Sequence, residues 1–178
     1  YMTGHDEVHS LANRYPEADV RFWMGFGDHY INVFTVLNNL GLLSEQPVKT
    51  AEGLEVIPLK VVKAVLPDPS SLAPDYVGKT CIGDFVRGTK DGKPAEVFIY
   101  NVADHKEAYN EVGSQGISYT AGVPPVAAAM LIADGTWDIG EMANVEDLDP
   151  KPFLDLLAKI GLPTHIKDVN GERLLSFA

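Results

Sequence analysis

Cysteine is almost absent from this sequence of 178 residues. The single cysteine, Cys81, excludes a disulfide within the chain and suggests a reducing compartment, so we expect a cytoplasmic location. Cys81 lies in a stretch that reads as a strand, which is more typical of a small core residue than of a nucleophile.

Positive charge and long apolar runs are also scarce. The chain has 14 Lys and Arg against 25 Asp and Glu, a formal net charge of −11, which argues against a nucleic-acid partner because phosphate binding needs a basic surface. No apolar run approaches the ~20 residues of a membrane-spanning helix, and no signal peptide is visible, so we expect no membrane partner. The chain starts at Tyr1 without an initiator Met, which we interpret as a piece of a longer protein.

Several catalytic signatures are missing as well. The sequence contains no G-x-G-x-x-G, no P-loop, no G-x-S-x-G and no cysteine cluster. His5 and His9 are one helical turn apart, but the zinc-protease motif needs Glu directly after the first His, where this chain has Asp6. We therefore expect no metal site and, from residue chemistry alone, a domain that binds a small ligand.

The segments that are present mix helices with hairpins. Apolar spacing predicts helices at 5–15, 28–40, 58–66 and 149–160, and strands at 20–26, 80–87, 95–102, 163–169 and 172–177. Hairpins without regular strand–helix alternation indicate an α+β fold, with a mixed, largely antiparallel sheet and helices packed on one face. We expect residues 1–178 to form a single domain.

The second strand of the main hairpin, 95–102, is apolar without alternation. Val97, Phe98, Ile99 and Tyr100 follow one another, so both faces of the sheet should be covered. One face should carry helices, and the other needs a missing domain or a second copy of the chain. We expect a homodimer that uses this second face.

The stretch 100–135 follows this strand and organises the chain. The strand ends at Asp104 and His105, and a short polar helix and a glycine-rich loop, 113–122, come next. A further helix is predicted to begin near Val123, with Pro124 in its first turn, where a missing N–H does no harm. Such a helix start would favour an anion, whereas a core helix with a proline start is the alternative interpretation.

The segment F-G-D-H-Y, 26–30, is predicted to be a second corner, between a strand and a helix capped by Asp28. His29 would lie in the first turn of that helix. The helix would bury a stripe made of Ile31, Phe34, Leu37 and Leu40.

Four sequence blocks, in the same order, resemble the catalytic C-terminal region of the saccharopine dehydrogenase-like family. They are R-F-W-M-G-F-G-D-H-Y at 21–30, L-K-V-V-K-A-V-L-P-D-P at 59–69, R-G-T-K-D-G-K at 87–93 and Y-T-A-G-V-P-P-V-A-A-A-M-L-I at 119–132. Within the family the resemblance is greatest to bacterial carboxynorspermidine synthases. Fungal-type saccharopine reductases carry Pro-Gly-His at a similar corner, where this chain has Phe26-Gly27-Asp28-His29.

The resemblance implies a two-part oxidoreductase of polyamine biosynthesis. In it, a Rossmann domain holds NADPH, and a second α+β domain, the part present in this chain, contributes the substrate wall and a dimer sheet. The implied reaction condenses aspartate β-semialdehyde with a diamine and reduces the imine. Because the dinucleotide fingerprint is absent here, we expect this chain alone to be inactive. A saccharopine dehydrogenase of lysine metabolism and a non-catalytic ligand-binding or oligomerisation module are the alternatives.

The implied chemistry needs proton transfer and anchors for a carboxylate and an ammonium. A histidine titrates near neutral pH, at about 6.5 when unperturbed. We therefore expect His29, His105 and Tyr119 to be catalytic, and we expect the substrate to be bound by Glu7, Gly27, Thr120 and Gly122. We further expect His29, His105, Tyr119 and Thr120 to converge on one cleft.

Overall fold

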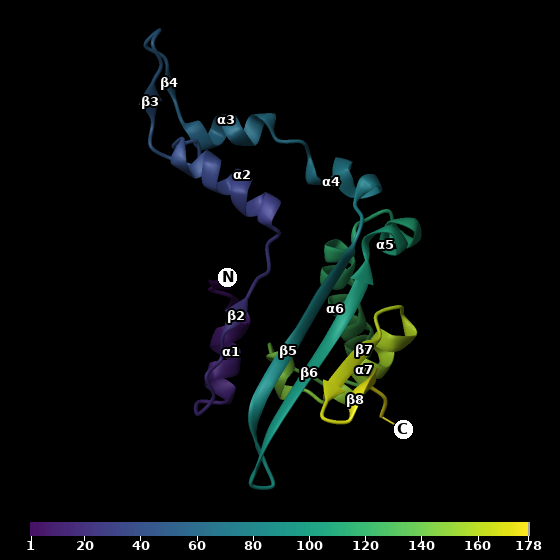
Figure 1. The fold of residues 1–178 in the computed structure, drawn as a ribbon. Coiled ribbons are helices and arrows are strands. Elements are labelled where there is room, and N and C mark those ends of the chain that lie inside the picture. Colours follow the sequence, from purple (N-terminus) through teal and green to yellow (C-terminus); the bar gives the residue numbers. More distant parts are fainter. Residues whose placement is uncertain (178) are drawn as a thin grey trace. The chain divides into compact units, whose positions relative to one another are not determined.

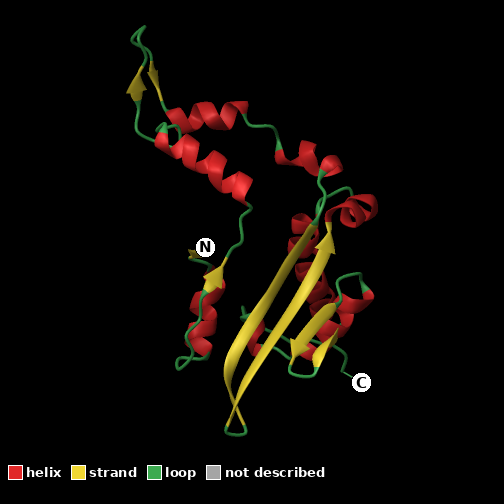
Figure 2. Ribbon diagram, in the orientation of Figure 1, coloured by secondary structure: helices red, strands yellow, loops and turns green. Residues whose placement is uncertain are grey.

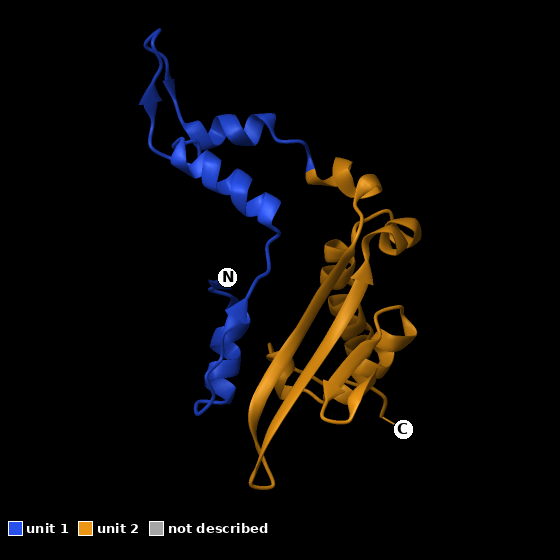
Figure 3. Cartoon of the chain, in the orientation of Figure 1, with its two compact units in different colours: residues 1–68 blue, residues 69–178 orange. Residues whose placement is uncertain are grey.

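The computed structural model describes residues 1–177 (Figure 1), and the chain divides into two compact units, which Figure 3 shows in different colours. Unit 1 comprises residues 1–68 and unit 2 comprises residues 69–178. Helices and antiparallel sheets together confirm the α+β class (Figure 2). The expectation that residues 1–178 form a single domain stays a prediction.

Unit 1 consists of short elements. They are β1 (Met2–Thr3), α1 (Asp6–Arg14), β2 (Phe22–Trp23), α2 (Asp28–Asn39), β3 (Val48–Lys49), β4 (Glu55–Val56) and α3 (Pro58–Val65). β1 pairs with β2, and β3 pairs with β4 around Gly53, whose φ of 84° suits a turn glycine. The predicted strand 20–26 is therefore wrong in extent, because only Phe22 and Trp23 pair.

Helix α2 begins and ends almost where its sequence predicts. Its N-cap is Gly27 rather than the predicted Asp28, and Gly41, at a φ of 72°, follows its end. The predicted buried stripe is wrong, because Phe34 is 48% exposed and Leu40 is 68% exposed. The apolar spacing is there, but unit 1 offers no surface that covers it.

Unit 2 carries one larger sheet and the longest helix. Its elements are α4 (Pro69–Leu72), η1 (Ala73–Asp75), β5 (Lys79–Lys90), β6 (Lys93–Asp104), α5 (His105–Val112), α6 (Gly116–Ala133), η2 (Val145–Asp147), α7 (Pro150–Lys159), β7 (Thr164–Asp168) and β8 (Gly171–Leu174). The single helical turn α4 and the 3-10 turn η1 connect unit 1 to the sheet strand β5.

The sheet has the order β5-β6-β7-β8 and is antiparallel throughout. The β5–β6 hairpin turns at Asp91 and Gly92, whose φ values of 52° and 74° belong to the tight turn that the residue pair favours. The structure therefore confirms the predicted hairpin and lengthens both of its strands. It also confirms the hairpin of β7 and β8 around Gly171.

Helix α6 starts earlier than predicted. The residues expected to form a loop, 116–122, belong to the helix, so Pro124 and Pro125 lie in its interior rather than in its first turn. Two prolines inside a helix remove the N–H groups that would reach the carbonyls of Thr120 and Ala121. The alanines that follow and tertiary packing outweigh this loss, which is why the local proline signal misplaced the helix start.

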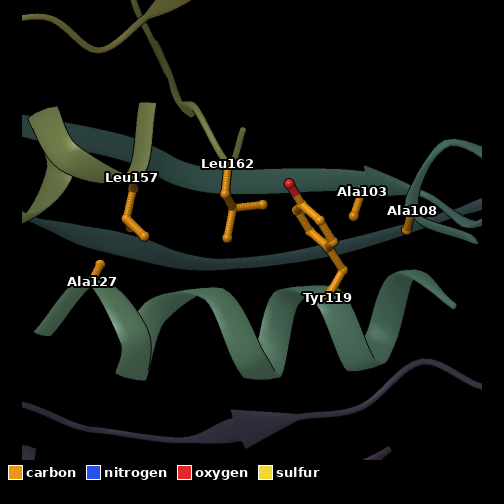
Figure 4. Packing of buried hydrophobic residues seen from close by; sticks show 6 residues of the cluster. All are labelled: Ala103, Ala108, Tyr119, Ala127, Leu157 and Leu162. Atoms are coloured by element: carbon orange, nitrogen blue, oxygen red, sulfur yellow. The ribbon is translucent and has the colours of Figure 1, made fainter. Parts of the chain in front are cut away.

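The core of unit 2 lies between α6, α7 and the sheet. Figure 4 shows Tyr119 and Ala127 of α6 pointing toward Leu157, Leu162 and the β-strands. Ala127 has no exposed surface, and Leu162 is 2% exposed. Small side chains at this contact let α6 approach its neighbours closely, as the run of alanines predicts.

Within residues 1–177, α6 is the one helix whose length and composition would suit a membrane span. This is weak support for a membrane, because the core helix of a globular protein passes the same test. One side of α6 packs against α5, α7 and the sheet strands β5 and β6.

Candidate functional site

His105 holds the junction between α5 and α6. Asp104 ends β6 and caps α5, because its carboxylate accepts hydrogen bonds from the N–H groups of Lys106 at 2.9 Å and Glu107 at 3.2 Å. The side chain of the next residue, His105, is thereby directed inward, where Nδ1 accepts a hydrogen bond from the N–H of Gly116 at 3.0 Å. His105 is only 7% exposed, so its ring is buried at this junction.

Gly116 has little room beside this histidine. A Cβ at Gly116 would lie 3.1 Å from both the Ala103 carbonyl oxygen and His105 Nδ1. Together with Gln115, whose side chain accepts from the N–H of Ile117 at 3.2 Å, His105 uses N–H groups of the first turn of α6. The anion preference expected at a helix start near Val123 loses its basis, because α6 starts at Gly116.

Tyr119 is a core residue of α6, 6% exposed. Its hydroxyl donates to the carboxylate oxygens of Glu111 at 3.1 and 3.2 Å, and it lies 3.4 Å from the carbonyl of Ile160. Burial and then the hydrogen bond to Glu111 raise the pKa of Tyr119. A tyrosine in this setting keeps its proton and donates a hydrogen bond to Glu111.

Thr120 and Gly122 take different positions on α6. Thr120 is 7% exposed, and its hydroxyl donates to the carbonyl of Ile117 at 3.1 Å, a bond within the helix. Gly122 is exposed, and an added Cβ there would have nothing within 4 Å. Their predicted role in substrate binding stays a prediction.

The remaining predicted site residues belong to unit 1. Glu7 lies in the first turn of α1, where its carboxylate contacts Nδ1 of His5, and that ring stacks on Phe22 at 4.2 Å. Gly27 precedes α2, and His29, in the first turn of that helix, is exposed. The convergence of His29 with His105, Tyr119 and Thr120 stays a prediction.

A groove of about 480 Å³ opens elsewhere, on the sheet of unit 2. It is lined by Phe85, Glu96, Phe98, Lys167, Asp168 and Val169, none of which was predicted as a site residue. Strand register explains the group, because Phe85 pairs with Phe98 and Phe98 pairs with Lys167. Ala103 packs into the helical core, and side chains alternate along a strand, so Phe98 and Tyr100 lie on the face away from α6.

Aromatic rings continue across this face. Phe98 stacks on Tyr100 at 4.5 Å, and Tyr100 stacks on His165 at 5.3 Å. A hydrogen bond to Glu172 is the main cause that raises the pKa of Tyr100 to about 12. We name this surface, made of Phe85, Phe98, Tyr100 and His165, the aromatic sheet face.

The remaining candidate groups are the thiol of Cys81 and the side chains that could bind a metal ion. Cys81 is exposed on β5, so the expectation of a core cysteine is wrong. Partial desolvation of its thiol by neighbouring atoms still raises the pKa above the ordinary value. Among residues 1–177, no three His, Cys, Asp or Glu side chains lie where they could share a metal ion.

The sequence model described as the saccharopine dehydrogenase C-terminal domain matches residues 1–162, and the chain belongs to that family. It is 50% identical over 169 residues to carboxynorspermidine synthases of Vibrio alginolyticus and Vibrio cholerae. It is also 43% identical over 172 residues to a carboxyaminopropylagmatine dehydrogenase of Synechocystis.

These matches cover nearly all of this chain but less than half of each relative. They extend over 95% of this chain and 41% of both Vibrio proteins, and over 96% of this chain and 43% of the Synechocystis protein. The resemblance inferred from the four sequence blocks is confirmed.

Gly161 and Tyr119 provide a test of the core geometry. Gly161 has a φ of 97°, and a Cβ there would collide with the Tyr119 hydroxyl. We expect Gly161→Ala to lower the free energy of unfolding by about 1–3 kcal/mol, the scale of strained backbone positions. In a Tyr119→Phe background the collision disappears and the backbone strain remains, so Gly161→Ala should cost less there.

Denaturant unfolding of the four proteins in this cycle measures the coupling. An equal cost of Gly161→Ala in both backgrounds would contradict the contact.

Proposed function

We propose that this chain is the substrate-binding and dimer-forming part of an NADPH-dependent oxidoreductase of polyamine biosynthesis. The full-length enzyme would condense aspartate β-semialdehyde with a diamine and reduce the imine, as a carboxynorspermidine synthase does. The observation that carries the proposal is 50% identity to two such synthases across 95% of the chain. NADPH would be held mainly by a Rossmann domain in the remainder of the polypeptide, and the enzyme would be cytoplasmic.

The proposed reaction needs proton transfer at two points, once to the substrate and once away from it. The carbinolamine loses water when a general acid protonates its hydroxyl, and the incoming amine must lose a proton to become a nucleophile. We assign these transfers to His29 and His105, with Tyr119 as a third candidate. His29 is the exposed one of the three. His105 could act only if a ligand approached its ring from the side opposite Gly116.

Substrate anchoring is assigned to two kinds of group. Glu7, 59% exposed in its side chain, offers a carboxylate for the far ammonium of a diamine. Gly27, Thr120 and Gly122 are proposed to line the amino-acid part of the substrate.

The Synechocystis relative supports a wider substrate range. Its name refers to carboxyaminopropylagmatine, so an amine other than a simple diamine is the second candidate substrate for this chain. A saccharopine dehydrogenase activity remains the alternative within the same chemistry, and a non-catalytic binding module the alternative outside it.

Activity of the full-length enzyme tests the proposal directly. We expect NADPH oxidation with aspartate β-semialdehyde and an amine from the set 1,3-diaminopropane, putrescine and agmatine. The 178-residue chain alone should neither oxidise NADPH nor change its fluorescence, because it lacks the dinucleotide fingerprint. No oxidation by the full-length protein with any of the three amines would overturn the function, and micromolar NADPH binding by the chain alone would overturn the assigned place of the cofactor.

Substitution of the two histidines tests their roles. We expect His29→Ala to lower kcat/KM by about 100-fold or more, the scale of a general acid–base group, with no change in the unfolding midpoint. His105→Ala should lower stability as well, because it leaves the N–H of Gly116 without its acceptor.

His105→Asn separates the two contributions of that residue. The asparagine oxygen can accept from Gly116 but cannot shuttle protons near neutral pH. A proton-transfer role therefore predicts a stable but impaired His105→Asn enzyme. If stability and kcat/KM are both restored by Asn, His105 is a positioning residue and not a catalytic one.

A homodimer through the aromatic sheet face is part of the proposal. Phe85 is 50% exposed on that face, and its neighbour Val86 is 52% exposed on the opposite face of β5. We expect Phe85→Glu to shift the protein toward monomer, because it replaces a ring of the aromatic sheet face by a charge that the interface would have to desolvate. Val86→Glu is the matched control and should leave the assembly unchanged.

Analytical ultracentrifugation of the full-length protein measures this effect. A wild-type monomer at high micromolar concentration, or equal dissociation by both variants, would contradict the proposed interface.

A further inference from the structure

Unit 1 lacks a core of its own. None of residues 1–68, all of which the structure describes, is buried. A stable domain of about 60 residues buries roughly 60% of the surface that its unfolded chain exposes. Unit 1 therefore needs a surface outside itself to hold its helices, and the position of its largest apolar side chains indicates where that surface binds.

A line of stacked rings follows the start of α2. Phe26 stacks on Tyr30 at 4.9 Å, Tyr30 stacks on Phe34 at 6.0 Å, and Tyr1 lies against Phe26 at 5.8 Å. Tyr30 and Phe34 lie four residues apart on one side of α2, and Phe26, just before the N-cap Gly27, extends the line of rings. We name Tyr1, Phe26, Tyr30 and Phe34 the α2 aromatic ladder.

The side chains of the ladder are largely exposed to solvent and nearly free of neighbouring charge. Tyr1 is 62% exposed, Tyr30 is 52% exposed and Phe34 is 48% exposed. In the twelve residues of α2 the one carboxylate is Asp28, in the first turn. Clustered, pre-stacked aromatic side chains without charge are typical of the centre of a protein interface, where they give contact area at little cost in side-chain freedom. The fitting partner is the apolar surface of a folded protein, not an anion or a metal ion.

The length of the relatives favours one partner. More than half of each relative lies beyond the segment that matches this chain, since the match covers 41% of both Vibrio proteins and 43% of the Synechocystis protein. A domain joined to unit 1 by the chain itself acts at an effective concentration in the millimolar range, which a free partner does not reach. We propose that the α2 aromatic ladder docks onto a folded domain of the same polypeptide that lies outside residues 1–178.

Amide hydrogen exchange tests this docking without reference to the reaction. We expect the α2 amides of the full-length polypeptide to exchange at least about 100-fold more slowly than those of the 178-residue chain. Docking would stabilise the helix against the local unfolding through which its amides exchange. Amides of β5 and β6 serve as the internal reference and should exchange alike in both proteins.

Two neighbouring substitutions in α2 sharpen the test. Phe34→Glu in the full-length polypeptide should abolish the extra protection, because it puts a charge in the docked ladder. Thr35→Glu adds the same charge one residue away, at an exposed position outside the ladder, and should leave the protection unchanged. The pair controls for the effect of the charge on the helix dipole.

Three results would overturn the proposal. Equal protection of α2 in the 178-residue chain at all concentrations would mean that the chain covers the ladder itself. Protection of that chain that grows with concentration would mean that a second copy covers it. Unprotected α2 amides in both proteins would mean that the ladder stays open. Each of these results leaves the proposed reaction untouched, so the two proposals fail separately.

Discussion

Close packing of α6 on the β5–β6 hairpin is the interaction on which unit 2 depends. The helix has no charged residue in 18 positions, and its stability comes from the side that it buries. Ala127 contributes a contact without bulk, while Leu157 and Leu162 fill the space beside it. The two interior prolines make this dependence stronger, because the helix loses two of its own hydrogen bonds and must recover the difference through packing.

Buried polar groups hold the N-terminal end of this packing. At the first turn, His105 accepts from Gly116, and Gly116 cannot carry a side chain without crowding the ring. One turn later, Tyr119 joins α6 to Glu111 of α5 and to the turn that ends α7. Residues whose chemistry suggests catalysis therefore also hold two helices in place, and a loss of activity on substitution has two possible physical origins.

The two units differ in how far they bury their apolar side chains. Unit 2 buries Ala103, Tyr119, Ala127 and Leu157 in one cluster, whereas unit 1 arranges comparable apolar side chains on surfaces that it cannot cover. Helix α2 forms because its apolar spacing and the glycine after its end agree locally, and these signals are sufficient to predict its bounds, although not its cap. The burial of α2 was not predictable in this way, since burial depends on which surface packs against the helix.

Local chemistry in the sequence determined the elements that are bounded by clear turn residues. The turns at Asp91-Gly92 and at Gly171 fixed two hairpins, because positive φ angles leave few alternatives there, and four sequence blocks were sufficient to recognise the family. Tertiary structure alone decided where α6 begins, since packing against the sheet outweighs the preference of Pro124 for a first turn. It also decided that His105 and Tyr119 are buried and bonded to Gly116 and Glu111. Such partners lie 8 to 11 residues away and meet only when helices pack, a distance that no local pattern reports.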